Sequence, residues 1–174
     1  DPEAARRCQE VAVGEDVTLD IGHKLDPQCG EPITVTAKVL RKSPPPPFVR
    51  GGLRGDFRYR GGILGGAWAS MGPSVVLAVG PVHLLVMTYP TYDWAYEQYE
   101  SMGMDVRRAK FVGVKNMMNF RFGYRDIMKG YFVLDLPGPT PADMRALPFQ
   151  RINRPIFPLD ENLHDPEIQI STSG

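Results

Sequence analysis

Four side chains able to bind a substrate lie within one short segment of the chain: Lys115, Asn116, Asn119 and Arg121. They follow Phe111–Val114, an apolar run that predicts a strand, and Asn116 suits the N-cap of a helix after it. Backbone N–H groups at a helix start attract anions, and a neighbouring lysine adds positive charge. Ligands also tend to bind at the carboxyl ends of strands in α/β units. The segment is therefore the predicted substrate-binding site.

A purely structural role also explains these residues. The helix is predicted to run from about Met117 to Lys129, and Asn116 can cap it without contacting a ligand. Arg121 can pair with a nearby acid while the neighbouring methionines and phenylalanines pack against the protein. The sequence leaves both explanations open.

Candidate catalytic groups elsewhere do not form a recognisable set. The histidines, His23, His83 and His164, are far apart and have no second ligand at metal spacing. Cys8 and Cys29 have no evident base, and Cys8 is expected to be a small buried hydrophobe within a helix. The chain has no Gly-x-Ser-x-Gly motif. No catalytic residue, metal or cofactor is therefore predicted for this chain by itself.

The composition is that of an ordinary folded protein. Of the 174 residues, 43% are hydrophobic and 23% are charged, and 20 basic residues balance 20 acidic ones. This balance favours neither a nucleic-acid partner nor a membrane partner. The apolar runs are too short to cross a bilayer, and two cysteines without a disulfide framework favour the cytoplasm. The glycine- and arginine-rich residues 50–66 predict a solvated loop or an irregular hairpin.

The N-terminal half predicts one helix followed by antiparallel strands. Asp1 suits a helix N-cap and Gly14 a helix end. Alternating apolar residues predict strands in residues 15–24 and 33–42, which are expected to pair as a hairpin. Two further strands are predicted on either side of the Gly80-Pro81 turn. Because a natural chain rarely begins on an N-cap, the sequence is expected to be part of a longer polypeptide.

The C-terminal half predicts a helix over residues 92–102 and then a strand, a helix and a strand. The two strands, residues 111–115 and 131–137, flank the predicted helix in the order of a right-handed β-α-β crossover. Many prolines after Pro137 predict an extended tail. The predicted fold class is therefore mixed α/β, or α+β, with antiparallel strands in the first half of a mixed sheet and a crossover near the C-terminus.

Several motifs of the chain occur in the same order in a known family. The chain carries VKNMMNFR and, further on, PGPTPADM, LPFQR and RPIFPLD. These resemble Lys-Ser-x-x-His-Phe-Arg, Pro-Gly-x-Thr-x-x-Asp-Leu, Leu-Pro-(Phe/Tyr)-x-Arg and Arg-Pro-Ile-(Trp/Tyr)-Pro-Leu-Asp of the C-terminal domain of the microcystinase C-like (MlrC-like) metallopeptidases. The N-terminal DPEA helix is also similar, so the resemblance covers residues 1–160.

The resemblance implies that residues 1–160 form an MlrC-like C-terminal domain. Residues 161–174, which lie beyond the resemblance, are expected to be a polar, flexible tail. The resemblance also implies a zinc-dependent peptidase or amidohydrolase as the parent protein, with its metal ligands in a preceding N-terminal domain. This chain is then an accessory domain that supports or covers the active site, its partners being that domain and a peptide or small amide substrate. A homo-oligomer is compatible with this arrangement.

Two departures from the family pattern bear on activity. The family's serine and histidine in Lys-Ser-x-x-His-Phe-Arg correspond to Asn116 and Asn119 here. Asparagine keeps hydrogen-bonding capacity but cannot exchange a proton near neutral pH. Whether the parent is an active enzyme therefore stays open, and the chain alone is expected to be inactive. The alternative is a stand-alone ligand-binding or interaction module without catalysis.

Overall fold

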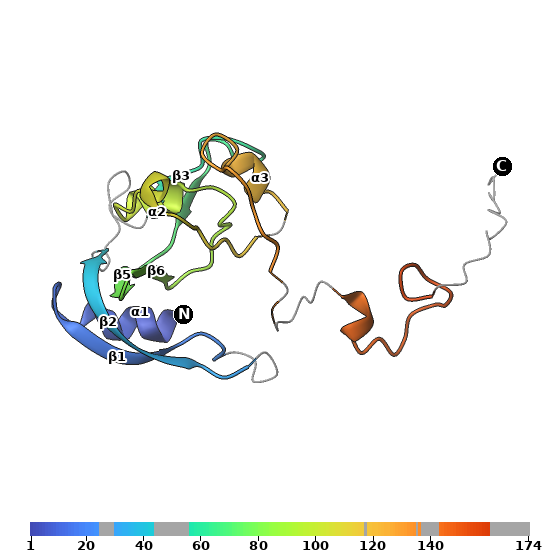
Figure 1. The fold of residues 1–174 in the computed structure, drawn as a ribbon, viewed down its shortest axis with the longest axis horizontal. Helices are drawn as coiled ribbons and strands as arrows, with labels where there is room; N and C mark the ends of the chain where they lie inside the picture. The colour runs from blue at the N-terminus through green and yellow to red at the C-terminus, as the bar shows by residue number, and fades with distance from the viewer. Residues whose placement is uncertain (25–29, 44–55, 117, 135, 137–142, 161–174) are drawn as a thin grey trace. The chain divides into compact units, whose positions relative to one another are not determined.

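The computed structural model describes residues 1–24, 30–43, 56–116, 118–134, 136 and 143–160 (Figure 1). The chain divides into two compact units. The first comprises Asp1–Pro27 and Glu31–Val133, and the second comprises Gln28–Gly30 and Leu134–Gly174. The first unit contains all the strands found among the described residues, together with the predicted site segment, so it is the part that positions the site.

Helix α1 spans Pro2–Gln9 and begins as the sequence predicts. The carboxylate of Asp1 accepts a hydrogen bond from the Ala4 amide at 3.1 Å, which satisfies one of the free N–H groups of the first turn. Ala4 and Cys8 are fully buried in a cluster with residues of the sheet. The prediction that Cys8 is a small buried hydrophobe is therefore confirmed. The helix is shorter than predicted.

Four antiparallel strands form the main sheet in the order β1-β2-β5-β6. Both predicted hairpins are present, with Leu19 opposite Val35 in the first and Val76 opposite Leu85 in the second. The antiparallel strands predicted in the first half of the chain are thus confirmed. Their bounds are β1 Asp16–Ile21, β2 Ile33–Lys42, β5 Ser74–Val79 and β6 Val82–Met87.

Strand β5 is buried on both faces and joins two hydrophobic clusters. Val75 and Leu77 pack in the cluster that contains α1, which lies along one side of the sheet (Figure 1). Val76 packs in the other cluster, together with Phe57 and Trp94. Because successive side chains of a strand point to opposite faces, a strand covered on both sides requires a continuous apolar run such as SVVLAV.

The glycine- and arginine-rich segment forms an irregular hairpin where it is described, as one of the two predicted alternatives states. Strand β3, Asp56–Arg58, pairs antiparallel with β4, Trp68–Ser70. Gly62 between them has a φ of +72°, and a Cβ there would overlap the ring of Trp94. The close approach of the hairpin to Trp94 therefore requires glycine at this position. The first part of the segment, residues 50–55, lies outside the described residues.

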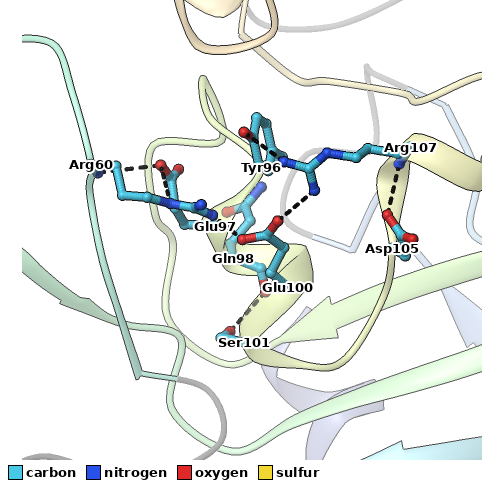
Figure 2. Close-up of polar contacts among 8 residues, drawn as sticks. All are labelled: Arg60, Tyr96, Glu97, Gln98, Glu100, Ser101, Asp105 and Arg107. Atoms are coloured by element: carbon cyan, nitrogen blue, oxygen red, sulfur yellow. Dashed lines mark hydrogen bonds and ion pairs between the residues drawn. The ribbon is translucent and has the colours of Figure 1, made fainter. Parts of the chain in front are cut away.

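Helix α2, Glu97–Ser101, contacts this hairpin through a network of ion pairs (Figure 2). Arg60 Nε lies 3.3 Å from Glu97 Oε1, and the Arg60 amide donates to the same oxygen at 3.2 Å. The Arg60 guanidinium also pairs with Glu100. Glu97 is buried, and these contacts supply partners for its Oε1, whereas its Oε2 is buried without a hydrogen-bond partner among the described residues.

The 3-10 helix Val106–Arg108 joins the same network (Figure 2). Arg107 Nη1 lies 2.9 Å from Glu100 Oε1, and Nη2 donates to the Tyr96 hydroxyl at 3.1 Å. The guanidinium groups of Arg60 and Arg107 lie 5.2 and 5.0 Å from the centroid of the Tyr96 ring, within cation–π range. Arg60 and Arg107 are thus both held by ion pairs with glutamates and by cation–π contacts with Tyr96.

The predicted β-α-β crossover near the C-terminus is not confirmed. Residues 111–115 and 131–134 belong to no strand, and the helix between them is reduced to α3, Phe120–Gly123. In the described part of the chain, no backbone–backbone hydrogen bond involves either run. An apolar run becomes a strand only where the edge of a neighbouring strand offers backbone hydrogen-bond partners. The sequence pattern of the run alone does not reveal whether such an edge is present. The helix predicted over residues 92–102 is likewise reduced to α2.

The second unit is mostly irregular. Its described residues 143–160 contain one 3-10 helix, Met144–Ala146. Residues 137–142 and 161–174 lie outside the described residues, so the extended tail and its flexible end stay predictions. No helix in the described part of the chain is long and apolar enough to cross a membrane.

The double burial of β5 predicts a large effect of truncating its central leucine. Leu77→Ala removes a side chain with no exposed surface, and we expect a loss of about 2–5 kcal/mol in the free energy of unfolding. Urea denaturation of both proteins measures this difference. Ile63→Ala is the matched control because Ile63 is 91% exposed, and it should change stability by less than about 0.5 kcal/mol. Equal losses in the two variants would contradict the assigned core.

Candidate functional site

The predicted site segment is held by two side chains instead of a strand ladder. The Lys115 amide donates a hydrogen bond to Asp93 Oδ2 at 2.6 Å, and the Tyr99 hydroxyl donates to the Gly113 carbonyl at 3.1 Å. Asp93 is half-buried shortly before α2, and Tyr99 belongs to that helix. The position of the segment therefore depends on the packing of α2.

Asn116 caps the turn that follows. Its Oδ1 accepts hydrogen bonds from the amides of Met118 at 3.0 Å and Asn119 at 3.2 Å. This is the arrangement by which an asparagine side chain satisfies free backbone N–H groups at the start of a helical turn. Asn116 therefore caps this turn, but the predicted helix N-cap lies elsewhere, because α3 begins at Phe120 with Asn119 at its N-cap position. A helix this short adds little dipole field, so the expected attraction of anions to its start is correspondingly weak.

Asn119 and Arg121 have different surroundings. Asn119 is half-buried at the N-cap position of α3, where its side chain makes no capping hydrogen bond. Arg121 is exposed and lies over the ring of Tyr131, with Cζ 4.5 Å from the centroid. No ion pair joins Arg121 to an acid within the described residues, so the expectation of such a pair is not met. Its charge instead rests on an aromatic face.

Lys115 presents a second exposed charge. Its backbone is fixed by Asp93, while its side chain reaches solvent. Among the described residues, the Lys115 ammonium has no ion-pair partner. The segment therefore combines a fixed backbone, two amide side chains and two exposed cations, a set suited to binding carboxylate or carbonyl groups.

Helix α3 packs directly on the chain before α2. A Cβ at Gly123 would overlap the carbonyl oxygen of Trp94, so only glycine permits this approach. The next residue, Tyr124, is buried, and its ring meets that of Tyr96 edge-on with centroids 5.8 Å apart. The capped turn and the two tethers thus rest on the same part of the fold.

Asp93, Tyr99 and Tyr124 are residues that the sequence did not reveal as part of the site. Burial raises the pKa of the Asp93 carboxyl, an effect that the hydrogen bond from the Lys115 amide opposes. Burial also raises the pKa values of the Tyr99 and Tyr124 phenols, which stay protonated at neutral pH. In the sequence the two tyrosines resemble packing residues of aromatic-rich turns. Asp93 is a single carboxylate that belongs to no recognisable motif.

The residues present do not fit a zinc site. In the described ranges, no three His, Cys, Asp or Glu side chains lie close enough to hold a metal ion. His23, in the loop after β1, and His83, on β6, are both exposed, and His164 lies outside the described residues. A catalytic zinc needs three protein ligands around one open position, which this set does not supply.

A shallow hollow of about 270 Å³ lies at the β3–β4 hairpin and contains none of the predicted site residues. It is lined by Arg58, Tyr59, Arg60 and Gly66. Arg58 Nε donates to the Gly66 carbonyl at 2.8 Å, and Arg60 is bound by α2. Arg60 is therefore ion-paired with acids of α2, whereas Arg58 donates to a neutral carbonyl and keeps its charge.

Comparison with known proteins places this fold and segment in a family. The family described as MlrC C-terminus matches residues 1–151, and the chain belongs to it. The chain is also similar to the crystal structure, at 2.13 Å resolution, of a candidate metallopeptidase from Mesorhizobium sp. BNC1, with a TM-score of 0.75 and 23% sequence identity. The match covers 92% of this chain but 30% of that protein's chain, so this chain spans less than a third of its neighbour. No curated protein matches it.

The geometry clarifies the departures from the motif that the sequence resembles. Serine and asparagine both rank among the best N-cap residues, so Asn116 can make the capping hydrogen bonds that a serine at this position of the motif would make. Asn119 differs in kind, because a neutral amide cannot carry the proton that a histidine carries. Relative to the motif, an asparagine at position 116 is compatible with the capped turn, and an asparagine at position 119 offers no ionisable group.

The cap predicts how position 116 tolerates substitution. Asn116→Ala removes the acceptor for two amides, and we expect the free energy of unfolding to fall by about 1 kcal/mol. Asn116→Ser keeps an acceptor and should lose only a few tenths of that amount. Chemical denaturation compares the three proteins. If the serine variant loses as much as the alanine variant, Asn116 does not act as a cap.

The half-buried carboxyl of Asp93 predicts a pH dependence of stability. Its pKa is raised by folding, so the folded protein binds the proton more tightly than the unfolded chain. Its contribution to stability therefore falls as pH rises from the ordinary aspartate pKa, about 3.9, to the raised value. Asp93→Asn keeps an acceptor for the Lys115 amide but removes this titration, so its stability relative to wild type should increase with pH across that window.

Thermal unfolding between these pH values measures the difference. Asp126→Asn makes the same substitution at a side chain that is 80% exposed and serves as the control for the chemical change itself. A parallel profile for Asp93→Asn would show that Asp93 is not titrating differently in the folded protein.

Proposed function

We propose that this chain is the C-terminal accessory domain of an MlrC-like peptidase or amidohydrolase. The observation that carries the proposal is the family match over residues 1–151, which includes the whole capped segment. A metallopeptidase description of the structural neighbour, and the small share of its chain that is matched, support a larger parent enzyme. The proposal assigns the zinc ligands to a preceding domain, since the described residues here do not fit a metal site.

The proposed role of the segment is to bind substrate beside that metal. Lys115 and Arg121 offer exposed positive charges that attract a carboxylate or polarised carbonyl group of a peptide or small amide. Asn116 holds the turn, and the amide of Asn119 can donate or accept one hydrogen bond without moving a proton. Asp93 and Tyr99 fix the backbone from which Lys115 projects. Zinc, when bound by the parent, supplies Lewis-acid activation.

The proposal places the parent in the cytoplasm, on the basis of its cysteine usage. Its test compares this 174-residue chain with the longer polypeptide that contains it. Metal analysis and a peptide-hydrolysis assay should find stoichiometric zinc and turnover in the longer protein only. Tightly bound stoichiometric zinc together with turnover in the 174-residue chain would overturn the accessory role.

Substrate binding by the segment has its own test in the longer protein. Lys115→Ala and Arg121→Ala should each raise KM about tenfold, the loss of roughly one charge-assisted hydrogen bond, with a smaller change in kcat. Arg6→Ala removes an exposed cation from α1 and serves as the control with unchanged kinetics. Unchanged KM in both site variants would confine the segment to capping and packing.

A further inference from the structure

The segment from Lys110 to Val133 exposes an unusual amount of apolar surface. Six of its large apolar side chains are between 46% and 85% exposed: Phe111, Met118, Phe122, Tyr131, Phe132 and Val133. Isolated exposed apolar residues are ordinary, but a concentration within one segment indicates an interaction surface. Phe132 and Val133 also lie in a run whose composition predicts a strand, yet the run has no ladder partner among the described residues.

The same segment is strongly basic in a chain without net charge. Between Lys110 and Val133 the only acidic residue is Asp126, whereas the basic residues number five: Lys110, Lys115, Arg121, Arg125 and Lys129. The rest of the chain must therefore carry a compensating negative excess, since the net charge of the whole is zero. Charge of one sign gathered in one segment favours a partner surface of opposite sign.

The basic and aromatic side chains are paired with one another. Lys110 Nζ lies 5.6 Å from the centroid of Phe111, and Arg125 Cζ lies 4.8 Å from that of Phe122. Arg121 covers Tyr131, as described above. Such pairs keep long basic side chains along ring faces, so that a partner meets apolar and positively charged groups together.

We infer that the segment from Lys110 to Val133 is the docking surface for the domain that precedes this one in the parent polypeptide, and that the face it meets is acidic and apolar. This inference rests on the proposed function. The structural neighbour has most of its chain outside the matched region, so a large preceding or following body is available as the partner. Docking through this segment would also carry Lys115 and Arg121 to the domain that binds the metal.

A second copy of the chain fits the surface less well. Two copies meeting through this segment would bring together two sets of five basic residues with one acid each, and like charges in contact oppose association. Single-stranded nucleic acid would satisfy the charge and stack on the exposed rings, but the exposed aliphatic side chains of Met118 and Val133 are better covered by an apolar protein surface.

The test is hydroxyl-radical footprinting of the 174-residue chain and of the longer polypeptide, which reports the solvent exposure of individual side chains. Phe111 and Phe132 should be labelled readily in the chain, since they are 73% and 82% exposed, and about fivefold or more slowly in the longer protein. Ile63, 91% exposed in the hairpin, should be labelled equally in both. Equal labelling of Phe111 and Phe132 in the two proteins would overturn the inference.

A charged substitution separates docking from folding. In the longer protein, Phe132→Asp should restore labelling of Phe111 toward its rate in the 174-residue chain, whereas the matched Ile63→Asp should not. If Phe132→Asp does not fold, the comparison of the two wild-type proteins still decides the matter. Shielding in the 174-residue chain that grows with its concentration, or on adding a single-stranded oligonucleotide, would assign the surface to a second copy or to nucleic acid and overturn the inference.

The outcome is distinguishable from that of the proposed function. Shielding of Phe111 and Phe132 in a longer protein without metal or turnover would retain the docking surface and reject the accessory role in a metallopeptidase. Metal and turnover without shielding would retain the accessory role and reject this docking surface.

Discussion

The burial of β5 on both faces is the constraint on which the rest of the first unit depends. Its side chains alternate between the cluster under α1 and the cluster that contains Trp94 and Met102. These two residues flank α2, so the second cluster sets where that helix lies. The tethers from Asp93 and Tyr99 then set where the backbone at Gly113 and Lys115 lies. A loosening of the core would therefore reach the site segment through α2.

A segment held by side chains differs from one held by a strand ladder. A ladder would bury the backbone and alternate side chains of residues 111–115 in the sheet. Two tethers fix the same backbone at Gly113 and Lys115, while the side chains of Phe111 and Lys115 remain exposed. Irregular segments positioned on a rigid scaffold are where binding residues concentrate in proteins. The lack of a ladder is thus consistent with the binding and docking roles proposed for this segment.

Asn116 and Asn119 belong to the same short motif but differ in role: the side chain of Asn116 shapes the turn, whereas that of Asn119 does not. Asn116 makes the two hydrogen bonds that start the turn, and a serine would satisfy the same amides with its hydroxyl. The side chain of Asn119 makes no such bond, so its substitution leaves the turn intact. A chain can therefore keep the geometry of the segment while changing the protonation chemistry available at it.

Sequence by itself determined the features whose causes are local. The N-cap at Asp1, the paired strands of both hairpins and the cap at Asn116 follow from residue type and spacing over a few positions, and all are present. Only the tertiary structure decided that residues 111–115 and 131–134 form no ladder and that Asp93 holds the Lys115 amide. A strand forms only where the edge of another strand is free to pair with it, and a side-chain tether forms only where folding brings its partner from elsewhere in the chain. The local sequence of a segment specifies neither condition.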